Sequence, residues 1–389
     1  MSLSNITLSA AVRQNLLSLQ GTADLLATTQ GRLATGKKVN SALDNPTNFF
    51  TAAGLDARAS DISNLLDSIG NGVQVLQAAN TGITSLSKLV DTAKSIANQV
   101  LQQPLGYSAK SSSTSTTVVG SAANLVDGVH IKATDVLQIA STAGGTATNI
   151  TFGASESLDQ LNTALAANNL TASLDSSNHL VISTTNDFAS STVGAITYTN
   201  TGGGTVTFGA VAGPTADAVS QATRASLVTQ YNQIVTQITT TAQDASFNGI
   251  NLLDGNSLKM IFDETGKSTL TIAGVTFDPA GLGLKPLTPG TDFTDNVLTG
   301  TVSTALDTAS IELRSQASAF GANLSIVEIR QDFSKRLINV LQTGSANLTL
   351  ADSNEEAANS QALSTRQSIA VSALSLANQS QQSVLQLLR

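Results

Sequence analysis

Apolar residues in the first and last segments of the chain recur at heptad spacing. Near the N-terminus, steps of four and three residues alternate through Val12, Leu16, Leu19, Ala23, Leu26, Gln30 and Leu33. Near the C-terminus, the same steps run through Leu363, Gln367, Ala370, Leu374, Ala377, Gln381, Val384 and Leu388. Such spacing keeps these side chains on one helix face, as in the seam of a coiled coil. The pattern therefore predicts two terminal helices with apolar seams.

These terminal seams are almost uncharged, whereas the ends of a soluble domain are normally polar and frayed. Polar residues at seam positions would weaken an isolated helix pair, although they can set its register in a larger assembly. They are Asn15, Gln30, Gln367 and Gln381. We therefore expect both ends to be disordered in a lone subunit and covered by other copies of the chain in a polymer. The alternative is that the two seams are only intramolecular core.

A longer seam over residues 55–90 predicts a second helix that begins after the turn at residues 44–46, because Pro46 bars continuation of the first helix. At helical rise this seam would run about 54 Å. Apolar residues also fall off the seam, so the helix should present apolar surface in more than one direction. Glycines within it each weaken an isolated helix by about 1 kcal/mol and indicate close packing. The glycines are Gly70, Gly72 and Gly82.

The composition changes to Ser, Thr, Gly and Ala over residues 105–216. Residues 158–165 have helical spacing, and short β-like runs separated by turn residues surround them. These runs are residues 129–131, 149–152, 180–183, 195–198 and 205–208. The pattern predicts a small inserted α+β domain.

Helical spacing returns over residues 224–238 and ends near the turn signal Asn248-Gly249. Two β-like runs, 258–262 and 268–277, then flank a glycine-containing loop and predict a β-hairpin. After it, a last long helix should carry the seam Leu306, Ala309, Leu313, Gln316, Phe320, Asn323 and Val327. We expect this seam and that of residues 55–90 to be intramolecular core.

The predicted fold is mainly α: long antiparallel helical rods and a terminal coiled coil, with a β-hairpin and an inserted α+β outer domain. The first and last segments can pair only if the chain folds back on itself, which would place both termini at one end. Three domains follow from this plan. Residues 1–40 with 350–389 would form a terminal coiled-coil core domain, 41–104 with 217–349 a helical rod domain carrying the hairpin, and 105–216 a variable outer domain.

Composition narrows the partners of the 389-residue chain. It has no Cys and no Trp, and its net charge of −8 includes no basic run, so we expect no nucleic-acid partner. Residues 367–388 carry no charge, but Gln, Ser and Asn are spread through them, so we expect no membrane insertion. The first residues lack the continuous apolar core of a signal peptide, so any export should not use a cleaved leader.

The chemistry-bearing motifs are weak. Residues 31–38 nearly spell a phosphate-binding loop, but Lys38 stands where a hydroxyl should meet Mg²⁺, so Gly36 is better explained as a helix terminator. His130 and His179 lack the HExxH pattern and any cysteine partner, and no GxSxG elbow is present. We therefore predict no catalytic residue, cofactor or metal site, and no enzyme.

Three separated segments resemble bacterial flagellins, the subunits of the flagellar filament. The segments are residues 32–46 (RLATGKKVNSALDNP) with 53–55 (AGL), 246–253 (SFNGINLL) and 376–389 (LANQSQQSVLQLLR). Their order makes the resemblance specific. It implies a structural subunit that self-assembles into the flagellar filament and transmits torque for swimming, with its terminal coiled coil lining the filament core.

The resemblance also implies partners and a location. The chain would be exported unfolded by the flagellar type III apparatus, polymerise with other flagellin copies, and meet an export chaperone, the filament cap and hook-junction proteins. It would end in the extracellular filament, and its hairpin region, residues 258–277, would be tied to supercoil switching. The alternatives are a hook–filament junction protein of the same organelle, or an adhesin or enzymatic activity carried by residues 105–216.

Two departures from the family pattern bear on function. Flagellins usually place the variable region between the hairpin and the last rod helix, whereas here the insert lies at residues 105–216. The epitope for the Toll-like innate immune receptor of animals reads LQRVRELA in the family, but residues 86–93 read LSKLVDTA, so Val90 replaces an arginine and Thr92 a leucine. We expect weak or no receptor activation.

Overall fold

The computed structural model describes residues 10–387, except for the side chains of residues 11, 381 and 384–387. The chain divides into two compact units. The first unit holds the described residues up to Asn71, together with Lys259–Leu270 and those from Ile326 onward. The second unit holds Gly72–Leu258 and Thr271–Ser325.

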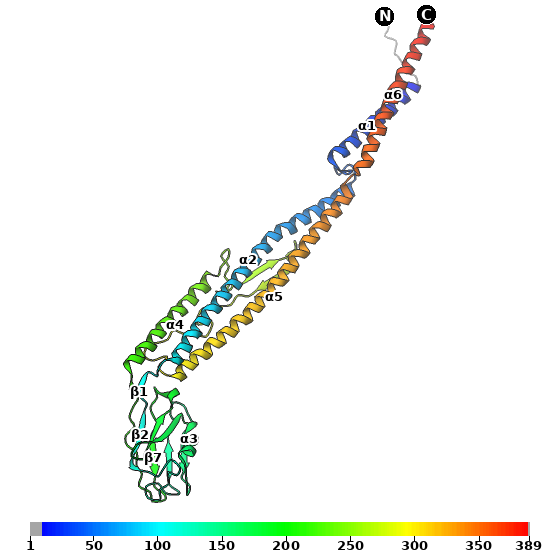
Figure 1. Ribbon diagram of the computed structural model, residues 1–389. Coiled ribbons are helices and arrows are strands. Elements are labelled where there is room, and N and C mark those ends of the chain that lie inside the picture. Colours follow the sequence, from blue (N-terminus) through cyan, green and yellow to red (C-terminus); the bar gives the residue numbers. More distant parts are fainter. Residues whose placement is uncertain (1–9, 388–389) are drawn as a thin grey trace. The chain divides into compact units, whose positions relative to one another are not determined.

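In the first unit, α1 (Ala10–Thr35) packs along α6 (Ser353–Leu387), as Figure 1 shows. The N-terminal part of α2 (Pro46–Gln102) packs there on the C-terminal part of α5 (Asn296–Thr349). The buried residues of this contact are Ala59, Ile62 and Leu341, flanked by Leu55, Leu337 and Ile338. The predicted fold class of long rod helices and paired terminal helices is confirmed.

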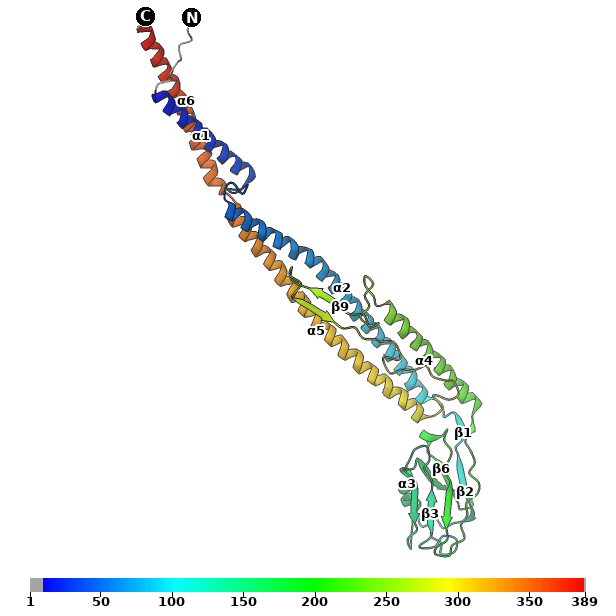
Figure 2. The ribbon, with the colours of Figure 1, turned by 180° about the vertical axis from the view of Figure 1, so that it is seen from behind.

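The predicted β-hairpin is also present, as β9 (Leu258–Ile261) and β10 (Thr269–Ile272). Within the first unit, Arg58 of α2 forms an ion pair with Glu264 in the hairpin loop at 2.5 Å. Arg330 of α5 lies over the ring of Phe262, 5.6 Å from its centroid. The loop is therefore held against both helices, as Figure 2 shows from behind.

In the second unit, α4 (Ala218–Asp244) and the adjoining parts of α2 and α5 form a helical layer. The seam of α5 is buried at Leu306, Leu313 and Phe320. On α2, both the seam residue Ile83 and the off-seam residue Leu86 are buried, which confirms apolar surface in more than one direction. Close packing at Gly82 is also confirmed, because an added Cβ would lie 2.6 Å from the Cβ of Ala245. The same prediction is wrong at Gly70 of the first unit, where an added Cβ would meet no atom within 4 Å.

The insert in the second unit contains two antiparallel three-stranded sheets around one apolar core. One sheet has the order β2 (Ser112–Val118), β6 (His179–Thr184), β5 (Leu170–Leu174). The other has the order β4 (Thr148–Thr151), β3 (Val136–Ile139), β7 (Ile196–Thr199). The helix α3 (Leu158–Ala166) begins with a capping box made by Ser157 and Gln160. The predicted α+β insert is therefore confirmed.

Individual strands differ from the sequence pattern. The runs at 149–152, 180–183 and 195–198 correspond to β4, β6 and β7, but residues 129–131 form no strand. There the carboxylate of Asp127 accepts hydrogen bonds from the backbone N–H groups of all three residues, at 2.7–3.0 Å, which bends the chain. The run at 205–208 contributes only an isolated bridge, between Ser115 and Phe208.

The two ends of the insert leave the helical layer through the short pair β1 (Tyr107–Ala109) and β8 (Thr215–Ala216). Beside this pair, the buried guanidinium of Arg224 donates to three backbone carbonyls. They belong to Pro104 at 2.8 Å, Phe293 at 2.7 Å and Gln103 at 3.1 Å. Burial lowers the pKa of Arg224, and the negative charge of Asp295 partly offsets this. One side chain thus joins the end of α2, the start of the insert and the loop before α5.

Candidate functional site in the terminal helices

The described part of the predicted C-terminal seam lies on one face of α6. Its members are half-buried, while most of their neighbours along the helix are exposed. These half-buried residues are Leu363, Gln367, Ala370, Leu374 and Ala377. The side chains of Gln381 and Val384, and the whole of Leu388, lie outside the described residues. The described positions therefore form the side of α6 that faces α1.

The N-terminal seam is arranged differently. Val12 is buried, and Leu19, Ala23 and Leu26 are half-buried, but Leu16 and Leu33 are exposed. The inner face of α1 uses Asn15 and Thr29 at the alternate positions in place of Leu16 and Gln30. This inner face also follows heptad spacing, but the alternate positions Asn15 and Thr29 each lie one residue before the predicted seam position.

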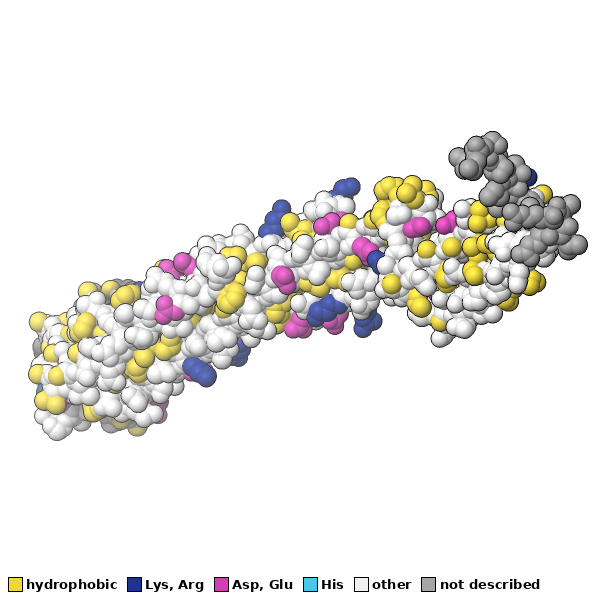
Figure 3. Space-filling view, turned by 90° about the horizontal axis from the view of Figure 1, so that it is seen from above, with side chains coloured by type: hydrophobic (Ala, Val, Ile, Leu, Met, Phe, Trp, Pro, Cys, Tyr) yellow, Lys and Arg dark blue, Asp and Glu magenta, His cyan; other side chains and the backbone are white. Residues whose placement is uncertain are grey.

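Large apolar side chains also remain exposed on both terminal helices. These residues are Leu16, Leu17, Leu25 and Leu33 of α1 and Ile369, Val371 and Leu376 of α6. Figure 3 shows hydrophobic side chains reaching the surface in patches among uncharged polar ones, with few charged side chains between them. Exposed apolar side chains in this number on two paired helices favour a protein–protein interaction site.

The segment that follows α1 ties the two terminal helices to the rest of the first unit. Gly36 ends α1 with a φ of +69°, a conformation that favours glycine. The backbone N–H of Lys38 donates to the carbonyl of Thr349 at 2.7 Å. Arg32 of α1 pairs with Glu356 of α6 at 3.1 Å. The segment that resembled a phosphate-binding loop is thus a helix end with a chain junction.

The loop that leads into α2 is ordered by two side chains. The carboxylate of Asp44 accepts hydrogen bonds from the backbone N–H groups of Ser41 at 2.8 Å and Asn40 at 2.9 Å, and these bonds lower its pKa. The side chain of Asn45 accepts from the N–H of Asn48 at 3.0 Å and caps α2, with proline at the first helical position. Between Asn40 and Asn45, Leu43 is 96% exposed.

The second flagellin-like segment, residues 246–253, stops α4 and reverses the chain. Phe247 and Ile250 exchange two backbone hydrogen bonds of 3.0 Å across Asn248 and Gly249, both of which have positive φ. The amide of Asn251 then donates to the last carbonyls of α4, at 2.7 and 2.9 Å. The sequence predicted the turn but not the capping role of Asn251. The only signal for that role is the position of an amide side chain directly after a turn that ends a helix.

The two receptor-epitope positions differ in exposure. Val90 is buried in the second unit, whereas Thr92 is exposed and its hydroxyl donates to the carbonyl of Lys88 at 2.8 Å. A side chain at position 90 therefore points into the protein.

The insert carries polar groups but no assembled reactive centre among the residues described. Each histidine contacts an aspartate three or four residues before it: His130 and Asp127 lie 2.7 Å apart, and His179 and Asp175 lie 3.2 Å apart. The described residues contain no group of three potential metal ligands among His, Cys, Asp and Glu.

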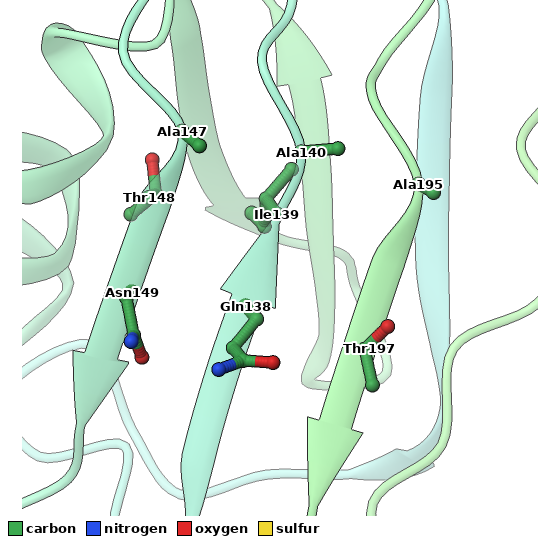
Figure 4. Close-up of a pocket in the computed structure, with 8 residues that line it drawn as sticks. All are labelled: Gln138, Ile139, Ala140, Ala147, Thr148, Asn149, Ala195 and Thr197. Atoms are coloured by element: carbon green, nitrogen blue, oxygen red, sulfur yellow. The ribbon is translucent and has the colours of Figure 1, made fainter.

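A shallow hollow lies on the sheet formed by β4, β3 and β7. Figure 4 shows Asn149, Gln138 and Thr197 side by side across the three strands, with a row of alanines beyond them. The lining of this hollow contains no ionisable side chain. Its groups could donate and accept hydrogen bonds but could not act as a general acid or base.

Among the described helices, none combines the length and the apolar character needed to cross a bilayer.

Comparison with known proteins agrees with the terminal helices. Residues 5–117 match the bacterial flagellin N-terminal helical region, and residues 303–388 match the bacterial flagellin C-terminal helical region. The chain is 35% identical to flagellin FljM and 34% identical to flagellin FljK, both of Caulobacter vibrioides, each over 168 residues. Each alignment covers 42% of this chain and 59% of the relative.

Flagellin A of Rhizobium meliloti is 37% identical over 84 residues, which are 22% of this chain and 21% of the relative. The chain thus matches less than two thirds of the length of these flagellins. Both matched regions nevertheless coincide with the helices that carry the exposed apolar side chains. The chain belongs to the bacterial flagellin family.

Proposed function

We propose that this protein is a structural subunit that self-assembles into the bacterial flagellar filament and transmits torque for swimming. The observation that carries the proposal is the set of exposed apolar side chains on α1 and α6, at the two ends of a chain that match flagellins. Burying a leucine side chain fully is worth about 1.5–3 kcal/mol. Copies of the same chain are the natural cover for seven such exposed residues in a polymer.

In this proposal, residues 1–40 with 350–389 form the polymer core. The predicted seam residues then divide into two roles. Val12, Leu19 and Leu26 face α6 within the subunit, and Leu16 and Leu33 face neighbouring subunits. Residues 41–104 with 217–349 form the surrounding rod, and residues 105–216 form an outer domain away from the core.

The proposal extends to partners and location. The protein would leave the cell through the flagellar type III apparatus without a cleaved leader and reside in the extracellular filament. An export chaperone would bind its C-terminal segment before export, and the filament cap and hook-junction proteins would contact it during assembly. A structural role, with no enzymatic activity, is proposed for the whole chain.

Polymerisation of the purified protein tests the main claim. Sheared filament fragments or salting out should induce filaments, and deletion of residues 363–389 should abolish them while circular dichroism still reports the other helices. Leu25→Asp, on the outward face of α1, should raise the critical concentration for assembly at least tenfold. Gln20→Asp is the matched control, since it adds the same charge to an exposed polar position of α1. Filaments from the deletion variant, or an unchanged critical concentration for Leu25→Asp, would refute the proposal.

A further inference from the structure

A second exposed apolar surface lies in the first unit, on the part of α5 that it contains. Ile326, Ile329, Phe333 and Val340 are each 45–66% exposed and are spaced by three, four and seven residues. This spacing places them on one helix face, over about 21 Å at helical rise. We call these four residues the α5 stripe. About 100° around the helix from the stripe, α5 is buried, as at Leu341.

The α5 stripe is a shallow groove with a charged border. Ile329 and Phe333 line the groove together with Asp332 and Arg336. Asp332 lies 3.9 Å from Lys335, so its charge is partly balanced within the helix. The exposed guanidinium of Arg336 is left as the positive group beside the apolar centre.

Two further exposed apolar residues of the same unit lie seven positions apart, Leu43 in the loop before α2 and Phe50 near the start of α2, and we call this pair the entry knob. Leu43 is 96% exposed and Phe50 is 66% exposed. The loop that presents Leu43 is fixed by the carboxylate of Asp44 and the helix cap at Asn45, described above. A side chain held outward on an ordered loop loses little conformational freedom when it binds, which favours docking.

The charges beside the two surfaces are opposite. Asp44 adjoins Leu43, and the backbone N–H groups of Asn40 and Ser41 hold its carboxylate in place. Arg336 borders the α5 stripe. An apolar knob next to a negative charge therefore matches an apolar groove next to a positive charge.

We propose that the entry knob of one copy docks on the α5 stripe of a second copy, with Asp44 facing Arg336. The inference rests on the proposed function, which supplies identical copies as partners, and it names a contact outside the terminal coiled coil. Because each surface is exposed in a single copy, neither covers the other within the chain. Two different complementary patches give a heterologous contact, and repetition of such a contact produces an open helical polymer.

Cysteine pairs test this contact directly, because the chain contains no cysteine. Leu43→Cys subunits are mixed with Val340→Cys or Ile329→Cys subunits, assembled on wild-type seeds under reducing conditions, and treated with a short bismaleimide. We expect a linked dimer from the mixture in filaments and none in the unassembled protein. Mixing Leu43→Cys with Val129→Cys is the control, since Val129 is 59% exposed but lies in the insert.

Each other outcome overturns the contact. Linked dimers from Leu43→Cys subunits alone would mean that the knob meets itself, and dimers from Val340→Cys alone would mean that the stripe does. Filaments that give no knob-to-stripe dimer with either stripe variant would also exclude the proposal, while leaving the proposed function intact. Wild-type protein that forms no filaments at all would instead count against the proposed function.

A second measurement does not depend on cross-linking. Phe333→Asp, in the centre of the stripe, should raise the critical concentration for seeded assembly at least tenfold, with circular dichroism unchanged. Val129→Asp should leave it within twofold of the wild type. Equal critical concentrations for Phe333→Asp and wild type would overturn the proposal.

Discussion

Arg224 should be the most sensitive single position at the base of the insert. The Arg224→Met substitution keeps an unbranched chain but removes a guanidinium that donates to the carbonyls of Gln103, Pro104 and Phe293. Each hydrogen bond to a charged group contributes about 1.5–3 kcal/mol, and a buried acceptor left without a partner costs about 1–3 kcal/mol. Removing one member of a buried charged network typically costs about 3–5 kcal/mol. We expect a loss of this size, since the three bonds share one side chain and do not add independently.

Urea unfolding of the unassembled protein, followed by circular dichroism, measures this loss in the second unit. Hydrogen exchange should rise at the backbone amides near residues 103–107 and 293–296, where the freed carbonyls lie. Arg314→Met is the matched control, because Arg314 is exposed and only one nitrogen contacts a side chain, the hydroxyl of Ser310. The control should lose less than about 0.5 kcal/mol. A loss below about 1 kcal/mol for Arg224→Met would refute the assigned role of its hydrogen bonds.

Three further predictions concern the second unit and the helix α2. Gly82→Ala should be less stable than Gly70→Ala by about 1–3 kcal/mol in urea unfolding. Both variants gain helix propensity, but of the two positions only Gly82 has atoms within 3 Å of an added Cβ. Equal urea midpoints for the two variants would contradict this prediction. In the insert, partial burial alone would raise the pKa of Asp127, but hydrogen bonds from the His130 side chain and three backbone N–H groups lower it to about 2. Because this pKa lies below the ordinary aspartate value near 4, the ionised carboxylate stabilises the folded protein at pH values above about 4, and this stabilisation is lost as the pH falls toward 2. Asp127→Asn should therefore lower the free energy of unfolding by about 1 kcal/mol at pH 7 after solvent screening, and should make stability depend less on pH in the acid range. Residues 86–93, with Val90 buried, should give weak or no activation of the Toll-like receptor in a reporter assay, and a response equal to that of activating flagellins would disprove it.

The rod helices were predictable because one physical rule determined their pattern. Along α5, the buried residues Leu306, Leu313 and Phe320 keep a single heptad seam, since only one side of the helix meets the rest of the unit. The hairpin was predictable for a similar reason, because a glycine-containing loop between two β-like runs has few alternatives.

The register of α1 could not be predicted from spacing alone. The helix carries leucines on two faces, so the step from Val12 to Leu16 and the step from Val12 to Asn15 both satisfy a heptad. Hydrophobicity favoured Leu16 as the inward residue, whereas the structure buries Asn15 more deeply than Leu16 and Thr29 more deeply than Gln30. The ambiguity arises because both faces are meant for burial, one inside the subunit and one, by our proposal, between subunits.

The strand β2 was missed because its core side is polar. Ser111, Ser113 and Ser115 are buried, and the hydroxyls of the first two donate to the carbonyls of Ala212 and Gly209, at 2.7 and 2.8 Å. A buried hydroxyl is tolerated when it is hydrogen-bonded, but no hydrophobicity pattern reports that partner. Strand assignment here depended on a segment about a hundred residues away in the sequence.

The pairing of α1 with α6 gives a final prediction. The seam residues on α6 are half-buried, and three of the five described ones, Gln367, Ala370 and Ala377, bury little apolar area. Two helices joined by such a seam are marginal in water without further packing. We therefore expect the backbone amides of residues 12–33 and 363–377 to exchange with solvent within seconds in dilute unassembled protein and to become protected in filaments.

The amides around Leu306–Phe320 provide the internal reference for that measurement. They belong to a seam that is buried within one chain, so they should be protected in both states. Salt-induced assembly should then change the exchange of the terminal helices by orders of magnitude and leave the α5 seam unaffected. Terminal helices as protected as α5 in the unassembled protein would mean that their pairing is complete without neighbours, and the outward leucines would need another explanation.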